Sequence, residues 1–161
     1  MMKPKTVQST SVVMSHMMLP PDANPAGIVH GGVVMKHIDD AAGVVAVRHS
    51  AGPAVTASID RLDFHHPAFI GNLLTVKAAI NLTGRTSMEI GARVETEDPV
   101  TGVINHTASA YLTFVALDEN NRPREIPGII PETNAEKRRN CEAVERRKNR
   151  LAKRTRKKAC R

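Results

Sequence analysis

The residues that could do chemistry are concentrated between positions 22 and 40 of this chain. A loop punctuated by Pro and Gly supplies a side-chain amide, Asn24, and runs through Gly31 and Gly32 into a segment that carries Asp39. Backbone N–H groups at the start of a helix can stabilise an oxyanion. A carboxylate can act as a general base or as a nucleophile. Together with an amide that orients water or a carbonyl, these groups could hydrolyse an activated acyl compound without a Ser or Cys nucleophile.

Each of these residues also has an ordinary structural interpretation. Burying a carboxylate in an apolar segment is costly unless it is paired, but Asp39 and Asp40 could simply mark where the helix reaches the surface. Adjacent helical positions point about 100° apart, so at most one of the two faces a shared cleft, and we expect Asp40 to be solvated. Asn24 precedes Pro25 and could form an Asx turn, while the glycines could merely loosen the helix start.

Other catalytic signatures are missing from the sequence. It contains no G-x-S-x-G elbow, no P-loop, no G-x-G-x-x-G and no paired Cys for zinc. His30 and His37 are seven positions apart without an evident third ligand, so no metal site is expected.

The elements that must position these residues are one long helix and a series of strands. Residues 6–19 predict a strand, and residues 30–49 predict a helix that is apolar on most sides and therefore buried. Further strands are expected at residues 55–60, 73–82, 88–95 and 103–117, the third of them with strict alternation. Consecutive strands after a single helix indicate an α+β fold, an antiparallel sheet of about five strands wrapped around that helix.

Charge divides the chain into two parts. The net charge of +7 is misleading, because residues 1–131 hold 10 Lys and Arg against 12 Asp and Glu, whereas residues 132–161 hold 13 against 4. In this second part Thr133 and Glu136 form a possible capping box ahead of a basic helix with too few apolar residues to build a core.

The expected organisation is therefore a flexible N-terminus of residues 1–5, a single domain of residues 6–131 and a basic helical tail of residues 132–161. The tail could pack in an oligomer, contribute arginines to phosphates, solubilise the protein, or bind nucleic acid or anionic membrane nonspecifically; we favour packing or solubilisation. No apolar run reaches the length of a membrane span and no secretory signal is present, so a cytoplasmic location is expected.

Taken together, the motifs resemble the acyl-CoA thioesterases of the hotdog fold, and among them the YciA and brain acyl-CoA hydrolase group. The resemblance covers about residues 6–131. It is carried by Asp22-Ala-Asn24-Pro-Ala-Gly27-Ile-Val-His30-Gly31-Gly32, Met35-Lys-His-Ile-Asp39, Arg48-His49, Asp63-Phe64-His-His-Pro67 with Gly71, and Gly84-Arg85-Thr86-Ser87.

The resemblance implies hydrolysis of acyl-CoA to a free fatty acid and coenzyme A, without a cofactor. It implies a homodimer, often assembled into a hexamer as a trimer of dimers, whose sites form between subunits. Asn24 of one subunit and Asp39 of the other would act on the thioester, with backbone N–H groups of Gly31 and Gly32 near the oxyanion.

The same resemblance places the segment Arg85-Thr86-Ser87, and with it His30, among the residues that bind the substrate. Two alternatives stay open. One is a non-enzymatic acyl-CoA-binding regulator whose basic tail contacts nucleic acid, although no specific nucleic-acid partner is expected. The other is a hotdog dehydratase, for which His37 beside Asp39 would supply the catalytic pair.

Overall fold

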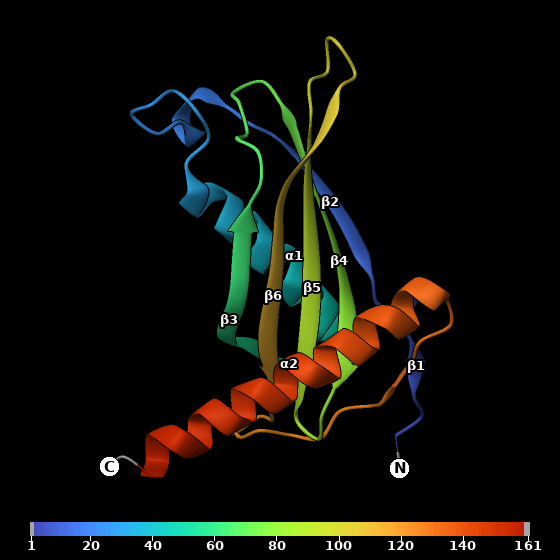
Figure 1. The fold of residues 1–161 in the computed structure, drawn as a ribbon. Coiled ribbons are helices and arrows are strands. Elements are labelled where there is room, and N and C mark those ends of the chain that lie inside the picture. Colours follow the sequence, from blue (N-terminus) through green and yellow to red (C-terminus); the bar gives the residue numbers. More distant parts are fainter. Residues whose placement is uncertain (1, 160–161) are drawn as a thin grey trace.

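The computed structural model describes residues 2–159 of the 161-residue chain, with side chains to residue 152. Its centre is a helix, α1 (Gly31–Ser50), held in the concave face of an antiparallel five-stranded sheet of order β2-β4-β5-β6-β3 (Figure 1). The strands are β2 (Val12–Met17), β3 (Ala54–Phe64), β4 (Leu73–Thr83), β5 (Ser87–Glu97) and β6 (Ile104–Ala116). The predicted α+β layout, with about five strands around one long helix, is confirmed.

Small side chains let α1 lie close to the sheet. Ala41, Ala42 and Ala46 are fully buried on the helix, alongside the larger buried side chains Val34, Ile38 and Val45. The inner faces of the central strands supply the other half of this core, with Leu74, Val76, Ile80, Met88, Ile90, Val94, Leu112 and Phe114. The alternation expected in residues 88–95 is the inward-facing row of β5.

Short elements tie the start of the chain to the segment that precedes the C-terminal helix. Strand β1 (Lys5–Thr6) pairs in parallel with β7 (Ile129–Ile130), and Lys5 Nζ donates to the carbonyl oxygens of Arg48 and His49 at 2.8 and 2.9 Å. Residues 1–5 were expected to be a flexible N-terminus, but the last of them, Lys5, pairs with Ile129 of β7. The first predicted strand is also shorter than expected, because residues 7–11 form a turn between β1 and β2.

A second helix, α2 (Asn134–Ala159), crosses the outer face of the sheet, on the opposite side from α1 (Figure 1). The predicted capping box is present. Thr133 Oγ1 accepts from the N–H of Glu136, and the Glu136 carboxylate accepts from the N–H groups of Glu132 and Thr133. None of the described helices is long and apolar enough to cross a membrane.

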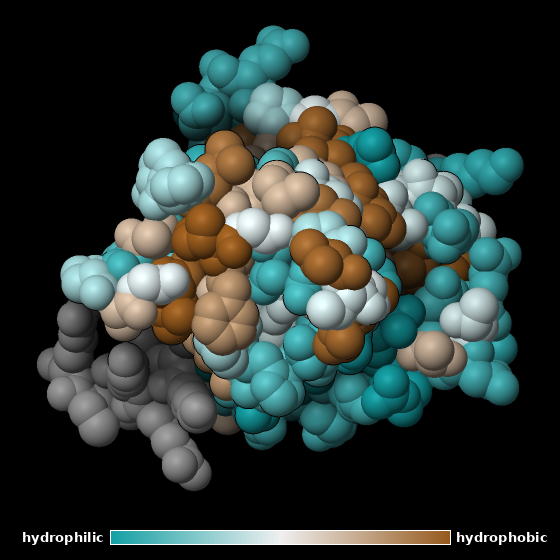
Figure 2. Space-filling view, turned by 90° about the horizontal axis from the view of Figure 1, so that it is seen from above, coloured by the Kyte–Doolittle hydropathy of each residue, from teal (hydrophilic) through white to brown (hydrophobic). Residues whose placement is uncertain are grey.

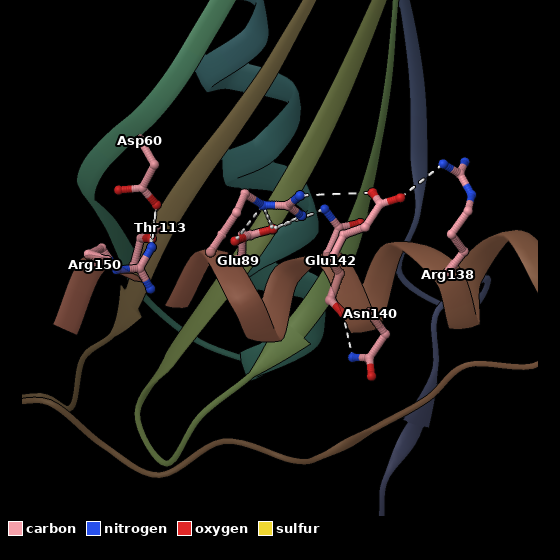
Figure 3. A network of polar contacts seen from close by, with 9 residues as sticks. Asp60, Glu89, Thr113, Arg138, Asn140, Glu142 and Arg150 are labelled. Carbon is pink, nitrogen blue, oxygen red and sulfur yellow. Dashed lines mark hydrogen bonds and ion pairs between the residues drawn. The ribbon is translucent and has the colours of Figure 1, made fainter. Parts of the chain in front are cut away.

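Charged side chains fix α2 to the sheet around the fully buried Ala143 (Figure 3). Arg146 binds the buried carboxylate of Glu89 on β5 at 2.7 Å, and its guanidinium lies 3.8 Å from the ring centre of Tyr111 on β6. Further along, Arg150 binds Asp60 of β3, and both contact Thr113. These arginines are committed to packing, one of the roles favoured for the tail, and are not free to contact nucleic acid.

A first prediction concerns the pair of Arg146 and Glu89. Arg146→Met leaves a carboxylate that is 2% exposed without its cation, which should lower the free energy of unfolding by roughly 3 kcal/mol. Arg138→Met is the matched control, because its ion pair with Glu142 is exposed and should contribute less than about 1 kcal/mol. Urea unfolding measures both, and equal effects would contradict a structural role for the buried pair.

A second prediction concerns pH. His49 at the end of α1 is fully buried, and its Nε2–H donates to the carbonyl of Pro127 at 2.8 Å. Burial lowers the pKa of His49 below its usual 6.5, so at lower pH the unfolded chain binds more protons than the folded one. The free energy of unfolding should therefore fall between pH 6.5 and about 5, above the range of ordinary carboxylates.

Burial also lowers the pKa values of His37 and His106, so they act in the same direction. Urea unfolding at several pH values in wild type and His49→Gln measures the effect of His49. A pH slope that is as steep in His49→Gln as in wild type would show that His49 does not contribute.

Candidate active site

Asp39 lies in the middle of α1 on the side that faces β3. Its side chain is half-buried, and Oδ1 accepts a hydrogen bond of 2.6 Å from Thr56 Oγ1. The two residues line a cleft of about 550 Å³ with Val44, Val55 and Phe114 among its walls. Asp39 is thus a carboxylate held in one orientation beside apolar surface.

Asp40 has a different environment from its neighbour. Its carboxylate is paired with Lys36 at 3.0 Å, one turn back along the helix, and its side chain is 45% exposed. Asp40 also lines the cleft, but it is exposed where Asp39 is half-buried, which agrees with the expectation that Asp40 is the more solvated of the two.

Thr56 was not among the residues singled out in the sequence. It lies on β3, an edge strand of the sheet, immediately before a register irregularity between Thr56 and Ser58. Such bulges re-aim side chains and are frequent beside active sites. The sequence Val-Thr-Ala-Ser shows only an ordinary polar alternation, so the contact with Asp39 could be found only once α1 and β3 were placed together.

Asn24 lies in a tight loop that precedes the N-terminus of α1. Its Oδ1 accepts from the N–H groups of Ala26 and Ile28 at 2.9 and 3.3 Å, and the loop turns through Gly27 with φ of +78°. The Asx turn considered for Asn24 is therefore present. Because the turn uses Oδ1, the amide nitrogen Nδ2 is the group left to donate to a ligand.

The start of α1 separates the roles of its two glycines. His30 caps the helix, and its Nδ1 accepts from the N–H of Gly32 at 2.9 Å. The N–H of Gly31 has no partner within the described chain and is one of the orphan donors of a helix N-terminus. Of the two proposed oxyanion donors, Gly31 is thus the one available without rearrangement, and the His30 ring is occupied as a cap.

A second cleft, of about 400 Å³, contains Asn24 and Gly31 with Phe64, His65 and Thr107. Figure 2 looks down on the end of the molecule that carries the loops, and apolar surface gathers there near the centre of a polar periphery. Exposed large apolar residues from this end include Leu19, Phe64 and Phe69.

The two clefts share no lining residue. Gly31 and Asp39 are eight residues apart on one helix, which is about 12 Å along its axis at 1.5 Å per residue. Within one chain, the orphan N–H of Gly31 and the carboxylate of Asp39 therefore cannot contact the same carbonyl group.

Arg85 and Thr86 lie in the turn between β4 and β5, and Ser87 is the first residue of β5. Arg85 is 81% exposed and lies 3.6 Å from Glu125. Ser87 pairs with Val115, which pairs with Val55 next to Thr56. The turn is thus at the end of the sheet nearest the cleft of Asp39, two strands away from β3.

His37 points away from Asp39. Its ring stacks on His16 of β2 with centroids 4.0 Å apart, on the side of α1 opposite β3. Burial lowers the pKa of His37, and neighbouring His16 lowers it further. The catalytic pair that a dehydratase would need from His37 and Asp39 is therefore not formed.

Comparison with known proteins places these features in a family. Residues 26–103 match the Thioesterase superfamily. Protein VdlD of Helicobacter pylori is 40% identical over 145 residues, which cover 90% of this chain and 83% of that protein. The cytosolic acyl coenzyme A thioester hydrolase of Mus musculus is 38% identical over 140 residues, 85% of this chain but only 36% of the mouse protein.

Solved structures agree over nearly the whole chain. A hexameric acyl-CoA thioesterase is 36% identical with a TM-score of 0.92, covering 94% of this chain and 97% of that one. The acyl-CoA hydrolase of Staphylococcus aureus, solved with butyryl coenzyme A and coenzyme A, is 32% identical with a TM-score of 0.89, covering 98% and 96%. The S. aureus enzyme has also been solved with an aspartate, an asparagine or a threonine individually replaced with alanine.

These likenesses extend over the helix, the sheet and both clefts, and neither the regulator nor the dehydratase finds support among them. The chain belongs to the thioesterase superfamily of the hotdog fold, with the acyl-CoA thioester hydrolases as its relatives.

Proposed function

We propose that this protein hydrolyses acyl-CoA to a free fatty acid and coenzyme A in sites shared between two copies of the chain. The observation that carries the proposal is the Asp39 carboxylate, held by Thr56 in an apolar-walled cleft, while Asn24 and Gly31 lie in a separate cleft of the same chain. The relatives support the proposal, because solved structures named acyl-CoA thioesterase and acyl-CoA hydrolase are similar to this chain over almost its entire length.

Asp39 is the group that acts on the thioester or on water. Because Thr56 donates to Oδ1, the carboxylate keeps its second oxygen free to take a proton from water as a general base, or to attack the carbonyl carbon directly. Coenzyme A leaves as a thiolate, so the reaction places little demand on a general acid.

The partner's loop supplies the groups that act on the carbonyl oxygen. The N–H of Gly31 is at a helix N-terminus, where the dipole favours negative charge, and it would stabilise the developing oxyanion. Nδ2 of Asn24 would orient the carbonyl or the water. Every step uses side chains, backbone N–H groups and water, so the proposal requires no cofactor.

Spacing in a relative supports the choice of residues. In the S. aureus enzyme the substituted asparagine and aspartate are 15 positions apart, as Asn24 and Asp39 are here. Its substituted aspartate and threonine are 17 positions apart, as Asp39 and Thr56 are. The same three residue types at the same intervals, in chains of the same fold, favour Asn24, Asp39 and Thr56 as the reactive set.

A second copy would also cover apolar surface beside the Asp39 cleft. Val47 on α1 and Val55 and Ile59 on β3 are each more than 40% exposed, and β3 is an end strand of the sheet. Exposed edges and apolar patches of this kind are sites of association. We propose a homodimer as the active unit, assembled into a hexamer as in the hexameric relative, and located in the cytoplasm like the cytosolic mouse relative.

The mechanism predicts that Asp39→Asn lowers kcat by about 10²–10⁴-fold, because the amide cannot accept the proton or attack the carbonyl. Thr56→Val should lower kcat by about tenfold, through loss of one hydrogen bond to a charged group. Thiol release from acyl-CoA of several chain lengths measures both. Asp40→Asn is the matched control and should retain activity; full activity of Asp39→Asn would sink the mechanism.

Sharing of the site between copies is tested by mixing two inactive variants. Asn24→Ala and Asp39→Ala should each be inactive alone. In hybrid dimers, two-fold symmetry places both substitutions in one site and neither in the other. Unfolding and refolding an equal mixture should restore about a quarter of wild-type activity, since about half of the dimers are hybrids with one intact site. No recovery, with hybrids shown by native mass spectrometry, would mean that Asn24 and Asp39 act within one chain.

A further inference from the structure

Two histidine rings pack face to face between β2 and α1, on the side of the helix away from the Asp39 cleft. The ring centroids of His16 and His37 are 4.0 Å apart, and the ring planes are inclined by only 23°. Nε2 of His16 and Nδ1 of His37 are buried, and neither has a hydrogen-bond partner among residues 2–152. Buried polar atoms are nearly always paired, so this contact differs from ordinary packing, and the proposed mechanism uses neither ring.

The geometry of the stack suits uncharged rings. A neutral imidazole has one nitrogen without a proton, whereas an imidazolium carries an N–H at both nitrogens. Protonation of His16 or His37 would therefore leave a buried N–H without an acceptor and place a charge in a poorly solvated contact, and both cost free energy. Two imidazolium rings at this separation would also repel each other. The contact is therefore strongest while both rings are neutral.

The charged groups around the stack do not compensate for protonation. Among the described residues, the carboxylates that act on His37 are those of Asp40 in α1 and of Asp22 in the turn η1 (Pro20–Asp22), and the cation is Lys36. The Asp40 carboxylate is bound to Lys36 at 3.0 Å, and that of Asp22 accepts from a backbone N–H at 2.8 Å. On β4, the residue paired with the other histidine is apolar and buried. Burial and the neighbouring ring outweigh the two carboxylates, which is why the pKa of His37 lies below its usual 6.5.

The two rings fasten together the chain segments on either side of the Asn24 loop. His16 is near the end of β2, the loop follows it, and α1 then returns the chain to His37. Within the loop, the carbonyl of Asp22 accepts from the N–H of His30, the N-cap of α1, at 2.8 Å. Asn24 is the second residue after this link. A change in how β2 packs on α1 is therefore transmitted to the position of Asn24.

We propose that His16 and His37 are positioning residues for the reaction, because their uncharged stack holds the Asn24 loop in its active arrangement and protonation of either ring releases it. The inference rests on the proposed function for the catalytic role of Asn24. Acid then lowers activity through the loop, separately from any protonation of the Asp39 carboxylate.

The pH dependence of kcat/KM for acyl-CoA hydrolysis tests this role. Because burial lowers the pKa of His37 from 6.5, the stack becomes charged on the acid side of that value. The kcat/KM of the wild type should fall about fivefold between about pH 7 and pH 5. His16→Phe/His37→Phe keeps two rings that can stack but cannot be protonated. Its kcat/KM at pH 5 should stay within about twofold of its own value at pH 7.

His49→Gln is the matched control, since it removes another buried histidine of α1 at the end of the helix far from the Asn24 loop. It should keep the acid loss of the wild type. His37→Phe alone should lessen the loss and provides a second variant if the double variant misfolds. Far-UV circular dichroism at pH 5 shows whether each protein is folded. An acid loss as large in the folded Phe variants as in the wild type, or one that disappears in His49→Gln, would overturn the inference.

Hydrogen exchange separates this inference from the proposed function, because it needs no substrate. After correction for the intrinsic effect of pH, the amides of residues 18–30 in the wild type should exchange about fivefold faster at pH 5 than at pH 7, while those of β5 stay unchanged. The double Phe variant should show no such change. Equal protection of the wild-type loop at both pH values would contradict the inference. An acid-released loop in a protein that hydrolyses no acyl-CoA would instead refute the proposed function and leave the role of the histidine stack in place.

Discussion

Burial of α1 in the concave face of the sheet is the contact that places every candidate residue. The helix lies close to the strands where its buried positions are small, at Ala41, Ala42 and Ala46, and Val34, Ile38 and Val45 fill the rest of the contact. Once the helix is held there, Asp39 necessarily projects toward β3 and meets Thr56, while His37 projects toward β2 and meets His16. The packing of α1 on the sheet therefore places Asp39 in the cleft and His37 in a ring stack between the helix and β2.

The outer face of the sheet is organised by charge instead. Glu89 alternates outward from an apolar strand and would be solvated if α2 were absent, but α2 buries it beneath Arg146. The desolvated carboxylate needs that cation, and the cation brings α2 to a fixed place on the sheet. A helix with too little apolar surface to build a core can thus still dock, because each of its anchoring arginines binds a carboxylate of the sheet.

Much of the fold was predictable because its signals are local. The apolar surface of residues 30–49, the alternation in residues 88–95 and the capping box of Thr133 and Glu136 are each confined to one element, and the structure confirms each. The paired Lys5, the anchors of α2 and the Asp39–Thr56 contact join residues far apart in sequence. None of these contacts leaves a periodic trace, so the sequence offered no signal for them.

The candidate site shows the same division. Asn24, Gly31 and Asp39 could be selected from one short segment. Their closeness in sequence suggests that they act on one substrate within a single chain, but the rise of the helix keeps Gly31 and Asp39 too far apart for that. The N–H of Gly32 donates to the ring of His30, so it is not available to an oxyanion. This hydrogen bond is part of the helix cap and could not be read from the sequence. Sequence identifies which groups are available, and the packed helix decides which of them can meet.

The division of the site between two clefts links catalysis to association. The apolar strip of Val47, Val55 and Ile59 borders the cleft of Asp39, so the surface that a second copy would bury is also the wall beside the carboxylate. Association of a second copy would remove water from that wall, which strengthens the electrostatic interactions of Asp39. It would also bring the partner's hydrogen-bond donors to the carbonyl of the substrate. An unpartnered chain would keep the carboxylate but lose the apolar enclosure and the oxyanion donor together. In the proposed homodimer, the interface that covers the exposed edge of β3 would therefore also complete the site.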